Sequence, residues 1–514
     1  MLVPTEVDGP AGSRRVRVLI FVVAYEAEST LEKVLERIPD SVLAHHTEIL
    51  VIDDASRDRT FEVGLRSSQS TRHRTTVLYN RENQGYGGNQ KLGYQYAIRR
   101  GFDVVVLLHG DGQYAPESIP ALLAPLIDGR ADAVFGSRML VPGAARKGGM
   151  PLYKFVGNKI LTSAQNWLLG SRLSEFHSGF RAYSVSALAC IPFGYNANAF
   201  HFDTEIIIQL MLAGSRIVEV PIPTYYGDEI CRVNGLKYAR DVVLTTIASR
   251  LHRLNIFYDR KFDVAGSTNT FYELKLGYAS SHSMALDAVP SGSRVLDIGC
   301  GPGSFDEQLA LKSCRVTGVD QFPPARPEAF EKFVLWNENT PFPDVELWQY
   351  DYVLLLDVIE HLKNPEAFLD RLREAARTLE RRPKFVVTSG NVVFAIVRLQ
   401  ALLGNFNYGK RGILDLTHTR LYTFTSLQRL FEQCGFNVEQ VEGIPAPFPK
   451  ALGFNAVSRA LLRLNQLLIL LSRGLFAYQI FLVATPGPSV DALLDASMEN
   501  GRRKAEALTS TLDA

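Results

Sequence analysis

Two series of apolar strands, each interleaved with helical segments, constrain the fold of this chain more than any other feature. The first series starts at Val16–Ala24 and the second at Arg294–Gly299. Strands that alternate with helices predict parallel sheets covered by helices, and strands that are apolar throughout predict burial on both faces. A length of 514 residues also exceeds what one hydrophobic core serves. We therefore expect two α/β domains.

The expected strands and boundaries follow from the apolar runs and the polar stretches between them. The first series comprises Val16–Ala24, Glu48–Asp54, Thr75–Asn80, Asp103–His109 and Ala131–Ser137. The second comprises Arg294–Gly299, Arg315–Asp320, Tyr350–Asp357 and Lys384–Gly390, followed by a closing antiparallel pair, Phe436–Gly443 and Tyr478–Ala484. The expected divisions are a flexible N-terminus at 1–15, a first domain at 16–258, a linker at 259–270, a second domain at 271–487 and a flexible tail at 488–514.

Composition argues against several functional classes. Lysine plus arginine (55) nearly balances aspartate plus glutamate (54), so the chain lacks the basic excess that nucleic-acid binding requires. The five cysteines show no CxxC spacing, which argues against a disulfide framework or zinc site and favours a reducing compartment. The sequence shows no signal-peptide stretch and no run of 18 apolar residues. The expected location is the cytoplasm, or the cytoplasmic face of a membrane, with no nucleic-acid partner.

Acidic residues follow two strands of the first series. Asp53 and Asp54 end the strand in VIDDASRDRT, and Asp111 follows the strand in HGDGQY. The carboxyl ends of parallel strands meet at one edge of an open sheet, where ligands of α/β folds bind. Carboxylates there suit ribose hydroxyls and a divalent cation that neutralises the phosphates of a leaving diphosphate. Taken singly, each aspartate is equally well explained as a helix cap or turn residue.

The first domain resembles family 2 glycosyltransferases of the GT-A fold, in particular the dolichyl- and polyprenyl-phosphate sugar synthases. The resemblance covers about Val16–Leu254 and rests on blocks in a fixed order, namely AYEAEST, VIDDASRDRT, NQGYGGNQKLGYQYA, HGDGQYAPE, FGSR, LSEFHSGFRAY, FDTEI and VPIPTYY. It implies transfer of a sugar from a nucleoside-diphosphate sugar to a polyprenyl phosphate or another glycan or glycolipid acceptor.

The resemblance also implies roles for the residues that bind the donor. Tyr25, with Asp53 or Asp54, would contact the base and the ribose. Asp111 would hold a manganese or magnesium ion with the diphosphate, and Arg138 would lie near the donor phosphates. The family usually has an aspartate where this chain has His109. His109 is either a second metal ligand or a residue that only orients Asp111.

Two further residues would serve the acceptor. Glu175 matches an acidic position of the family and would accept the proton of an acceptor hydroxyl. If the acceptor is a phosphate, which is already ionised, Glu175 would only position it. Arg181 would then neutralise that phosphate, and an internal ion pair is the alternative role for this arginine.

A glycine-rich loop follows the first strand of the second series. DIGCGPG places Gly299, Gly301 and Gly303 after a strand that ends near Asp297, and Asp320 ends the next strand. Glycines allow close approach of a ligand to the backbone, and a carboxylate at this spacing suits ribose hydroxyls. An acid followed by three alternating glycines favours S-adenosylmethionine (SAM), with NAD as the weaker alternative.

The second domain resembles class I SAM-dependent methyltransferases of Rossmann-like fold, especially those related to the ubiquinone-biosynthesis O-methyltransferases. The resemblance spans about Phe271–Pro486 and rests on the glycine loop, YDYVLLLDVIEHLKNPE and TFTSLQRLFEQCGFNV. It implies that Asp357 and Val358 flank the SAM held by the glycine loop and Asp320. Asn337 or Glu338 would replace the usual acidic contact to adenine.

Methyl transfer to oxygen usually needs a base near the acceptor. His418 is the favoured candidate and His361 the second, although a structural histidine is an equally good explanation of each. Two apolar inserts, at Asn391–Gly412 and Ala451–Gly474, either cap the methyl acceptor or touch a membrane surface.

The sequence thus predicts a bifunctional enzyme, a glycosyltransferase followed by a methyltransferase that acts on a saccharide or lipid-linked hydroxyl. The alternative is a methyltransferase whose first domain only binds substrate, and the substitution at His109 motivates it.

Overall fold

The computed structural model describes residues 16–224, 234–254, 256–264, 274–337, 339–340, 342–343, 345–376, 382–488, 493–494, 497–498 and 500–502. The chain divides into two compact units, residues 1–253 with 259–269, and residues 254–258 with 270–514. The boundary between the two units therefore does not coincide with the linker expected at 259–270. The described part of that stretch packs into the first unit, because Phe262 and Val264 are fully buried there and Lys261 Nζ lies 2.8 Å from Glu205 Oε1.

The first unit contains a seven-stranded sheet with the strand order β3-β2-β1-β4-β6-β5-β7. β1 pairs in parallel with β2 and β4, whereas β6 runs antiparallel to β4 and β5. The five expected strands are confirmed, and β6 and β7 are additional. The strands are β1 (Arg17–Ala24), β2 (His46–Asp53), β3 (Arg74–Tyr79), β4 (Val104–His109), β5 (Ala133–Ser137), β6 (Arg181–Ser184) and β7 (Ile217–Pro221).

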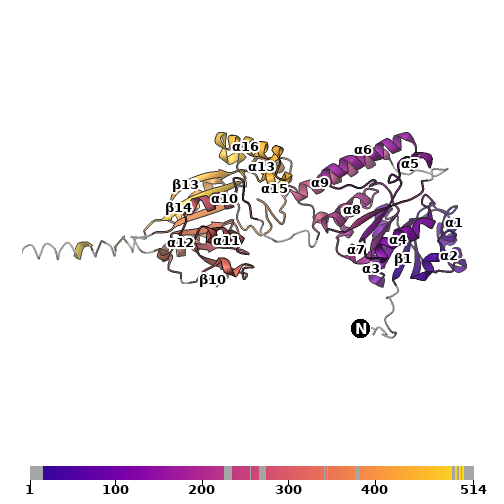
Figure 1. Ribbon diagram of the computed structural model, residues 1–514, viewed down its shortest axis with the longest axis horizontal. Helices are drawn as coiled ribbons and strands as arrows, with labels where there is room; N and C mark the ends of the chain where they lie inside the picture. The colour runs from indigo at the N-terminus through magenta and orange to yellow at the C-terminus, as the bar shows by residue number, and fades with distance from the viewer. Residues whose placement is uncertain are drawn as a thin grey trace, which may run out of the picture. The chain divides into compact units, whose positions relative to one another are not determined.

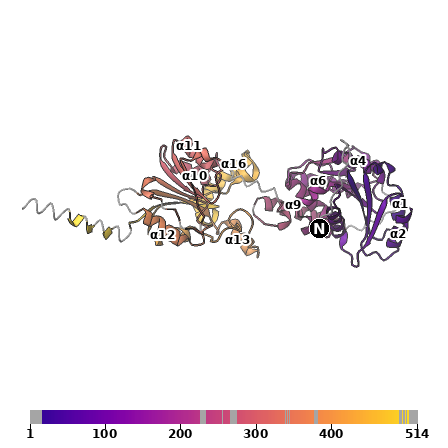
Figure 2. The ribbon, with the colours of Figure 1, turned by 90° about the horizontal axis from the view of Figure 1, so that it is seen from below.

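Helices cover both faces of this sheet. Alternate residues of β1 point to opposite faces, so Val18 and Ile20 belong to one apolar cluster while Leu19 and Phe21 belong to another. α1 packs on α2, and α2 lies along the edge strand β3 (Figure 2). The helices are α1 (Leu31–Glu36), α2 (Thr60–Ser70), α3 (Gly85–Arg100), α4 (Ile119–Ile127), α5 (Ala144–Lys147), α6 (Leu152–Leu169), α7 (Val185–Ala189), α8 (Phe202–Leu212) and α9 (Gly235–Arg253).

The second unit also contains a seven-stranded sheet, with the order β10-β9-β8-β11-β12-β14-β13. β8 pairs in parallel with β9 and β11, and β14 runs antiparallel to both β12 and β13. The expected closing antiparallel pair is therefore confirmed. The strands are β8 (Arg294–Ile298), β9 (Arg315–Asp320), β10 (Lys332–Leu335), β11 (Tyr352–Leu356), β12 (Lys384–Gly390), β13 (Phe436–Ile444) and β14 (Gln479–Pro486).

The two apolar inserts of the second unit form helices of their own. The first insert contains α13, and the second contains α16 with parts of its neighbours α15 and α17 (Figure 1). Within the part of the chain that the structure describes, no helix is both long and apolar enough to cross a bilayer. The helices are α10 (Ser281–Ala288), α11 (Ser304–Leu311), α12 (Pro365–Ala375), α13 (Ala395–Leu402), α14 (Phe424–Gln433), α15 (Phe448–Leu452), α16 (Ala456–Leu471) and α17 (Arg473–Phe476).

The packing of α3 on the first sheet yields a stability prediction. A methyl group added at Gly93 of α3 would lie 2.1 Å from Cε1 of Phe21, so Gly93→Ala must push the helix away from β1. We expect a loss of about 1–3 kcal/mol in the free energy of unfolding of the first unit, measured by urea titration with circular dichroism. Gly157→Ala on α6 is the matched control. Its new methyl group meets nothing within 4 Å, so it should stabilise the helix by about 0.5–1 kcal/mol. Equal effects of the two substitutions would contradict the packing described.

Candidate functional site

The carboxyl ends of β1, β2 and β4 meet at one edge of the first sheet. Asp53, the last residue of β2, is in register with the last residue of β1, and His109, the last residue of β4, is in register with the residue before it. Tyr25 and Asp54 directly follow β1 and β2, and Asp111 comes two residues after β4. Strand register therefore brings the predicted donor-binding residues to one place.

Asp53 and Asp54 differ in how their carboxylates are occupied. Oδ1 of Asp53 accepts a hydrogen bond from the backbone N of Ser56 at 3.0 Å, while Oδ2 is buried without a donor among the described residues. Burial raises the pKa of Asp53 above its usual value. Oδ1 of Asp54 accepts hydrogen bonds from Nδ2 of Asn80 at 2.7 Å and from the backbone N of Gln84 at 2.9 Å. Asp54 thus fixes the loop before α3, whereas Oδ2 of Asp53 has no hydrogen-bond donor among the described residues.

His109 and Asp111 have different surroundings. Nε2 of His109 lies 3.4 Å from the Tyr86 hydroxyl, and its ring packs edge-on against Tyr86 and Tyr114. Burial lowers the pKa of His109 below its usual value. Asp111 is exposed, and its Oδ1 accepts a hydrogen bond from the backbone N of Gln113 at 3.0 Å. Asp111 is the more accessible of the two predicted metal ligands.

A divalent cation fits this edge only together with a ligand that brings its own oxygen atoms. Across the described ranges, no three His, Cys, Asp or Glu side chains are grouped so that they could hold a metal ion. Magnesium in proteins is commonly held by one or two carboxylates plus the phosphates of a substrate. Asp111 supplies such a carboxylate. The residues present therefore suit a cation that arrives with a diphosphate.

Arg138 lies at the same edge as the acidic loops. Phe135 of β5 and Leu107 of β4 are both in register with Arg181 of β6. The carboxyl end of β5 is therefore level with that of β4, and Arg138 directly follows it. The side chain of Arg138 retains 14% exposure. Arg138 thus lies at the same edge as the acidic loops, with part of its side chain exposed.

A buried ion pair joins Arg138 to Glu175. The guanidinium contacts Oε1 of Glu175, and the backbone N of Arg138 donates to Oε2 at 2.8 Å. Nδ2 of Asn158, on α6, donates to Oε1 at 2.8 Å. Burial alone would raise the pKa of Glu175, but the charge of Arg138 and these hydrogen bonds hold it below its usual value. The carboxylate of Glu175 is ionised and orients Arg138.

Arg181 forms the internal ion pair that the sequence left open as its alternative role. Its Nη1 lies 3.4 Å from Oδ1 of Asp203. The same guanidinium donates to the carbonyl oxygens of Phe176 and Ser178 at 2.9 and 2.8 Å. Only 1% of the Arg181 side chain is exposed. In this structure Arg181 holds the segment that carries Glu175 and has almost no surface that a phosphate could reach.

The glycine loop of the second unit leaves open backbone beside a carboxylate. Gly301 has a φ of +57°, and a methyl group added there would meet nothing within 4 Å. The backbone N of Gly301 donates to Oδ2 of Asp320 at 2.8 Å. A methyl group on Gly299 would lie 2.5 Å from Cγ2 of Val358, and one on Gly303 would lie 2.8 Å from Cε2 of Phe330. Because the loop faces open space at its middle and carries an acid at its side, these residues fit SAM.

Two buried carboxyl groups lie beneath this loop. Asp297 and Asp306 are 3% and 0% exposed, and their side chains contact each other. Burial raises the pKa of Asp297 to about 7 and raises that of Asp306 as well. A second ionised carboxylate beside the first is disfavoured in such a place. The two acids flank the glycine loop in the sequence, Asp297 before it and Asp306 after it.

Asp357 adopts a backbone conformation that is rare outside glycine, with a φ of +56°. Its Oδ1 accepts hydrogen bonds from Oγ1 of Thr388 at 2.7 Å and from Nε2 of Gln479 at 2.8 Å. Burial alone would raise the pKa of Asp357, but Lys275, 3.7 Å from Oδ2, and these hydrogen bonds hold it below its usual value. Val358, the next residue, contacts the glycine loop at Gly299.

His418 and His361 lie side by side, with ring centroids 4.8 Å apart. Nδ1 of His418 lies 3.0 Å from the carbonyl oxygen of Ile413, and Nδ1 of His361 lies 3.3 Å from that of Thr417. A carbonyl oxygen can only accept, so Nδ1 of each ring carries a proton, and Nε2 of a neutral His418 then has a lone pair. Burial and the neighbouring His361 lower the pKa of His418. His418 is therefore neutral at pH 7 and able to accept a proton.

Sequence reasoning did not single out three acidic residues that hold these sites. Asp203 pairs with Arg181, Asp306 contacts Asp297, and Glu219 of β7 accepts a hydrogen bond from the backbone N of Ser174 at 2.8 Å. Two of them carried a sequence signal: Glu219 is a single carboxylate inside the apolar strand IVEVP, and Asp203 lies in the FDTEI block of the family resemblance. Only burial in the fold distinguishes Asp306 from an ordinary surface acid.

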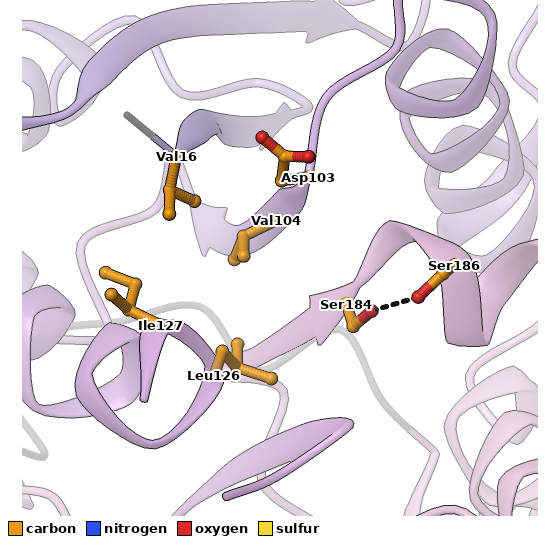
Figure 3. Close-up of a pocket in the computed structure, with 7 residues that line it drawn as sticks. All are labelled: Val16, Asp103, Val104, Leu126, Ile127, Ser184 and Ser186. Atoms are coloured by element: carbon orange, nitrogen blue, oxygen red, sulfur yellow. Dashed lines mark hydrogen bonds between the residues drawn. The ribbon is translucent and has the colours of Figure 1, made fainter. Parts of the chain in front are cut away.

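The hollow in Figure 3 lies away from these residues, at the opposite end of the first sheet. Val16 and Asp103 directly precede β1 and β4, so the hollow opens at the amino ends of strands whose carboxyl ends carry the acidic loops. Oδ2 of Asp103 accepts a hydrogen bond from the backbone N of Arg17 at 2.9 Å. The residues lining the hollow are Val16, Asp103, Val104, Leu126, Ile127, Ser184 and Ser186. It takes no part in either candidate site.

The two units match different protein families. The model of "Glycosyl transferase family 2" matches residues 19–191, and that of "Methyltransferase domain" matches residues 273–441. The undecaprenyl-phosphate mannosyltransferase of Micrococcus luteus is 31% identical over 212 residues, which are 40% of this chain and 82% of that protein. The polyprenol monophosphomannose synthase of Mycolicibacterium smegmatis is 28% identical over 207 residues, 40% of this chain and 76% of that protein.

A third relative and a solved structure match the same part of the chain. The UDP-N-acetylglucosamine–dolichyl-phosphate N-acetylglucosaminyltransferase of Methanococcus voltae is 27% identical over 222 residues, 41% of this chain and 86% of that protein. Glucosyl-3-phosphoglycerate synthase of Mycobacterium tuberculosis aligns with 48% of this chain and 82% of its own, at 21% identity and a TM-score of 0.35. That score is too low to support any conclusion about this chain.

The fold class expected from the sequence is confirmed by the two mixed α/β sheets together with the two family matches. The first unit carries a family 2 glycosyltransferase domain and the second a methyltransferase domain, each built on a mixed α/β sheet. The chain is a transferase that belongs to glycosyltransferase family 2 through its N-terminal part and carries a methyltransferase domain in its C-terminal part.

Proposed function

We propose that the chain is bifunctional. Its first domain transfers a sugar from a nucleoside-diphosphate sugar to a polyprenyl phosphate or related glycan-lipid acceptor. Its second transfers a methyl group from SAM to a hydroxyl of a saccharide or lipid-linked saccharide. The observation that carries the proposal is the edge of the first sheet, where Asp53, the exposed Asp111 and Arg138, oriented by Glu175, each lie at or just after the carboxyl end of a strand. The names of the three relatives support a polyprenyl-phosphate acceptor.

In the proposed sugar transfer, the acceptor oxygen attacks the anomeric carbon and the bond to the diphosphate breaks. The electron pair of that bond leaves on the diphosphate, so positive charge is needed beside the departing phosphates. Arg138 supplies a fixed positive charge, and Asp111 would hold a manganese or magnesium ion that does the same. Tyr25 and Asp53 would bind the base and the ribose of the donor.

Glu175 serves this reaction best as a positioning residue. Its lowered pKa and its contacts with Arg138 and Asn158 make it a weak base. A phosphate acceptor is ionised at neutral pH and needs no base. The structure of the pair therefore favours a lipid phosphate over a sugar hydroxyl as the acceptor. Such an acceptor implies contact with the cytoplasmic face of a membrane.

In the proposed methyl transfer, SAM supplies a methyl group from its positively charged sulfonium. The glycine loop and Asp320 would hold the cofactor, with Val358 beside them. Nε2 of His418 would accept the proton of the acceptor hydroxyl as its oxygen bonds to the methyl carbon and the carbon–sulfur bond breaks, so that S-adenosylhomocysteine would leave with that electron pair. His361 lies against His418 and is the alternative base.

The alternative function, a first domain that binds substrate without turning it over, makes a different prediction. In that case the purified chain would bind nucleotide-sugars without releasing nucleoside diphosphate. The tests below separate the two functions.

Asp111→Ala and His109→Asn test the donor site. We expect Asp111→Ala to lower kcat/KM for nucleotide-sugar turnover, with manganese and a polyprenyl phosphate, by at least about a hundredfold, because the cation loses its carboxylate. His109→Asn should cost less than about tenfold, since Nε2 of His109 faces Tyr86. S-adenosylhomocysteine should stabilise both variants as it does the wild type. Equal turnover by wild type and Asp111→Ala would contradict the assignment.

Glu175→Gln and Arg138→Lys test the positioning role. Because the two residues act as one unit, we expect each to lower kcat/KM by about ten- to a hundredfold and the double variant to cost little more than either alone. The pH profile of Glu175→Gln should keep its shape. Loss of the acidic limb of that profile would show instead that Glu175 is the catalytic base.

His418→Ala and the pH dependence of methyl transfer test the second site. The pKa of His418 is lowered from 6.5, so the wild-type rate should be constant above pH 7 and fall only below about pH 6.5, where Nε2 becomes protonated. We expect His418→Ala to lower kcat by at least about a hundredfold and to leave the affinity for S-adenosylhomocysteine unchanged. His361→Ala is the matched control and should cost less. A larger loss in the control would transfer the role of base to His361.

A further inference from the structure

The amphipathic helix α16 buries polar side chains and exposes most of its leucines. The residues it buries against its own domain are Ser458, Leu462 and Asn465, two of which are polar. Asn465 anchors the helix, since its Oδ1 accepts a hydrogen bond from the backbone N of Ala446 at 2.9 Å and its Nδ2 donates to the carbonyl oxygen of Phe476 at 2.9 Å. The leucines of α16 mostly point away from the domain. A helix that only capped a core would bury them.

The outward face of α16 forms a continuous apolar stripe. Val457, Leu464, Leu467 and Leu471 are 63%, 52%, 62% and 80% exposed. They stand three, four or seven positions apart, which places them along one side of a helix. Phe454, just before the helix, is 71% exposed and adds to the apolar surface at its amino end. So much exposed leucine on one helix marks an interaction surface.

The first insert exposes a second group of apolar side chains. Leu399, Leu402 and Leu403, on or directly after α13, are 56%, 84% and 68% exposed. Phe394 and Val397 of the first insert share a buried cluster with Ala446, and the backbone N of Ala446 donates to Asn465 of α16 in the second insert. The two inserts therefore belong to one region of the second unit.

The charged side chains in the two inserts and the residues directly beside them are all basic. Neither 391–414 nor 443–490 contains an aspartate or a glutamate. The basic residues in these stretches are Arg398, Lys410, Arg411, Lys450, Arg459, Arg463 and Arg473, all of them exposed. Elsewhere the chain balances its charges closely, with 55 basic and 54 acidic residues. Apolar side chains flanked by cations alone are complementary to an anionic lipid surface, which offers hydrocarbon beneath negative headgroups.

We propose that α16, together with α13, docks the methyltransferase domain on an anionic lipid bilayer, with the helices lying in the plane of the interface. α16 has 16 residues and carries Arg459 and Arg463, so it suits the interface and not the bilayer interior. The stripe enters the headgroup boundary, and the flanking arginines meet lipid phosphates.

The docking surface is linked to the candidate methyl-transfer site. Ile413 and Leu414 belong to the same buried cluster as α13, and the carbonyl oxygen of Ile413 holds Nδ1 of His418. Docking would bring the base to a substrate that is itself anchored in the bilayer. The methyl acceptor is then a lipid-linked saccharide, a step that rests on the proposed function, whereas the docking itself does not require turnover.

Vesicle binding tests the docking without any catalytic readout. The full chain is sedimented with vesicles of phosphatidylcholine alone or of phosphatidylcholine with phosphatidylglycerol. We expect binding to the anionic vesicles that weakens as salt is raised. Leu464→Ser/Leu467→Ser/Leu471→Ser should lower the partition coefficient by at least about tenfold. Arg459→Gln/Arg463→Gln should lower binding to the anionic vesicles only.

Leu311→Ser/Leu335→Ser is the matched control, because these leucines are 76% and 63% exposed on other elements of the same unit. This variant should bind vesicles like the wild type. Thermal stabilisation by S-adenosylhomocysteine shows that each variant is folded. Unchanged vesicle binding by a folded triple-leucine variant would overturn the proposal. So would a wild type that ignores vesicles and forms a dimer which the triple variant loses, since the stripe would then bind a second copy.

Discussion

The parallel pairing of the central strands is the constraint on which both candidate sites depend. In the first unit it sets the ends of β1, β2 and β4 side by side, and in the second it does the same for β8, β9 and β11. Loops that follow neighbouring parallel strands must meet at one edge, whatever their sequences are. The chain uses this geometry twice with different loop chemistry. Acidic residues and an arginine collect at the first edge, and glycines with an acid collect at the second. Similar scaffolds thereby present different side chains at their edges in the two units.

The neighbours of each buried carboxyl group near these edges decide whether its pKa is lowered or raised. Glu175 is buried beside Arg138 and stays ionised, with its pKa below the usual value. Asp297 is buried beside Asp306, another acid, and its pKa rises to about 7. The same desolvation therefore accompanies a lowered pKa in one unit and a raised pKa in the other, because the neighbours differ. In the first unit the carboxylate of Glu175 holds Arg138 in place. In the second the two acids flank the glycine loop in the sequence.

Much of this architecture was predictable from the sequence, and the exceptions have physical reasons. The apolar runs and the closing antiparallel pair predicted most strands, since burial on both faces leaves a clear pattern. The sequence left the roles of Arg181 and Asp54 undecided, because their hydrogen-bond partners depend on how distant segments pack. Arg181 donates to the carbonyl oxygen of Phe176, and Asp54 accepts from the backbone N of Gln84. The described part of the stretch 259–270, expected to be a linker, packs into the first unit instead. Two apolar residues within this polar stretch, Phe262 and Val264, are fully buried there. The orientation of α16 could not be read from its amphipathic pattern, which is the same whether the leucines face inward or outward.

The central claim is that one chain carries two separate ligand sites, one for a nucleotide-sugar with a cation and one for SAM. Calorimetric titration of the full chain tests it most directly, with UDP- or GDP-sugars in the presence of manganese and with S-adenosylhomocysteine. We expect saturable binding of at least one nucleotide-sugar that depends on the metal. We also expect binding of S-adenosylhomocysteine that is unaffected by occupation of the first site. Absence of nucleotide-sugar binding under every metal condition, or binding of NAD in place of S-adenosylhomocysteine, would contradict it.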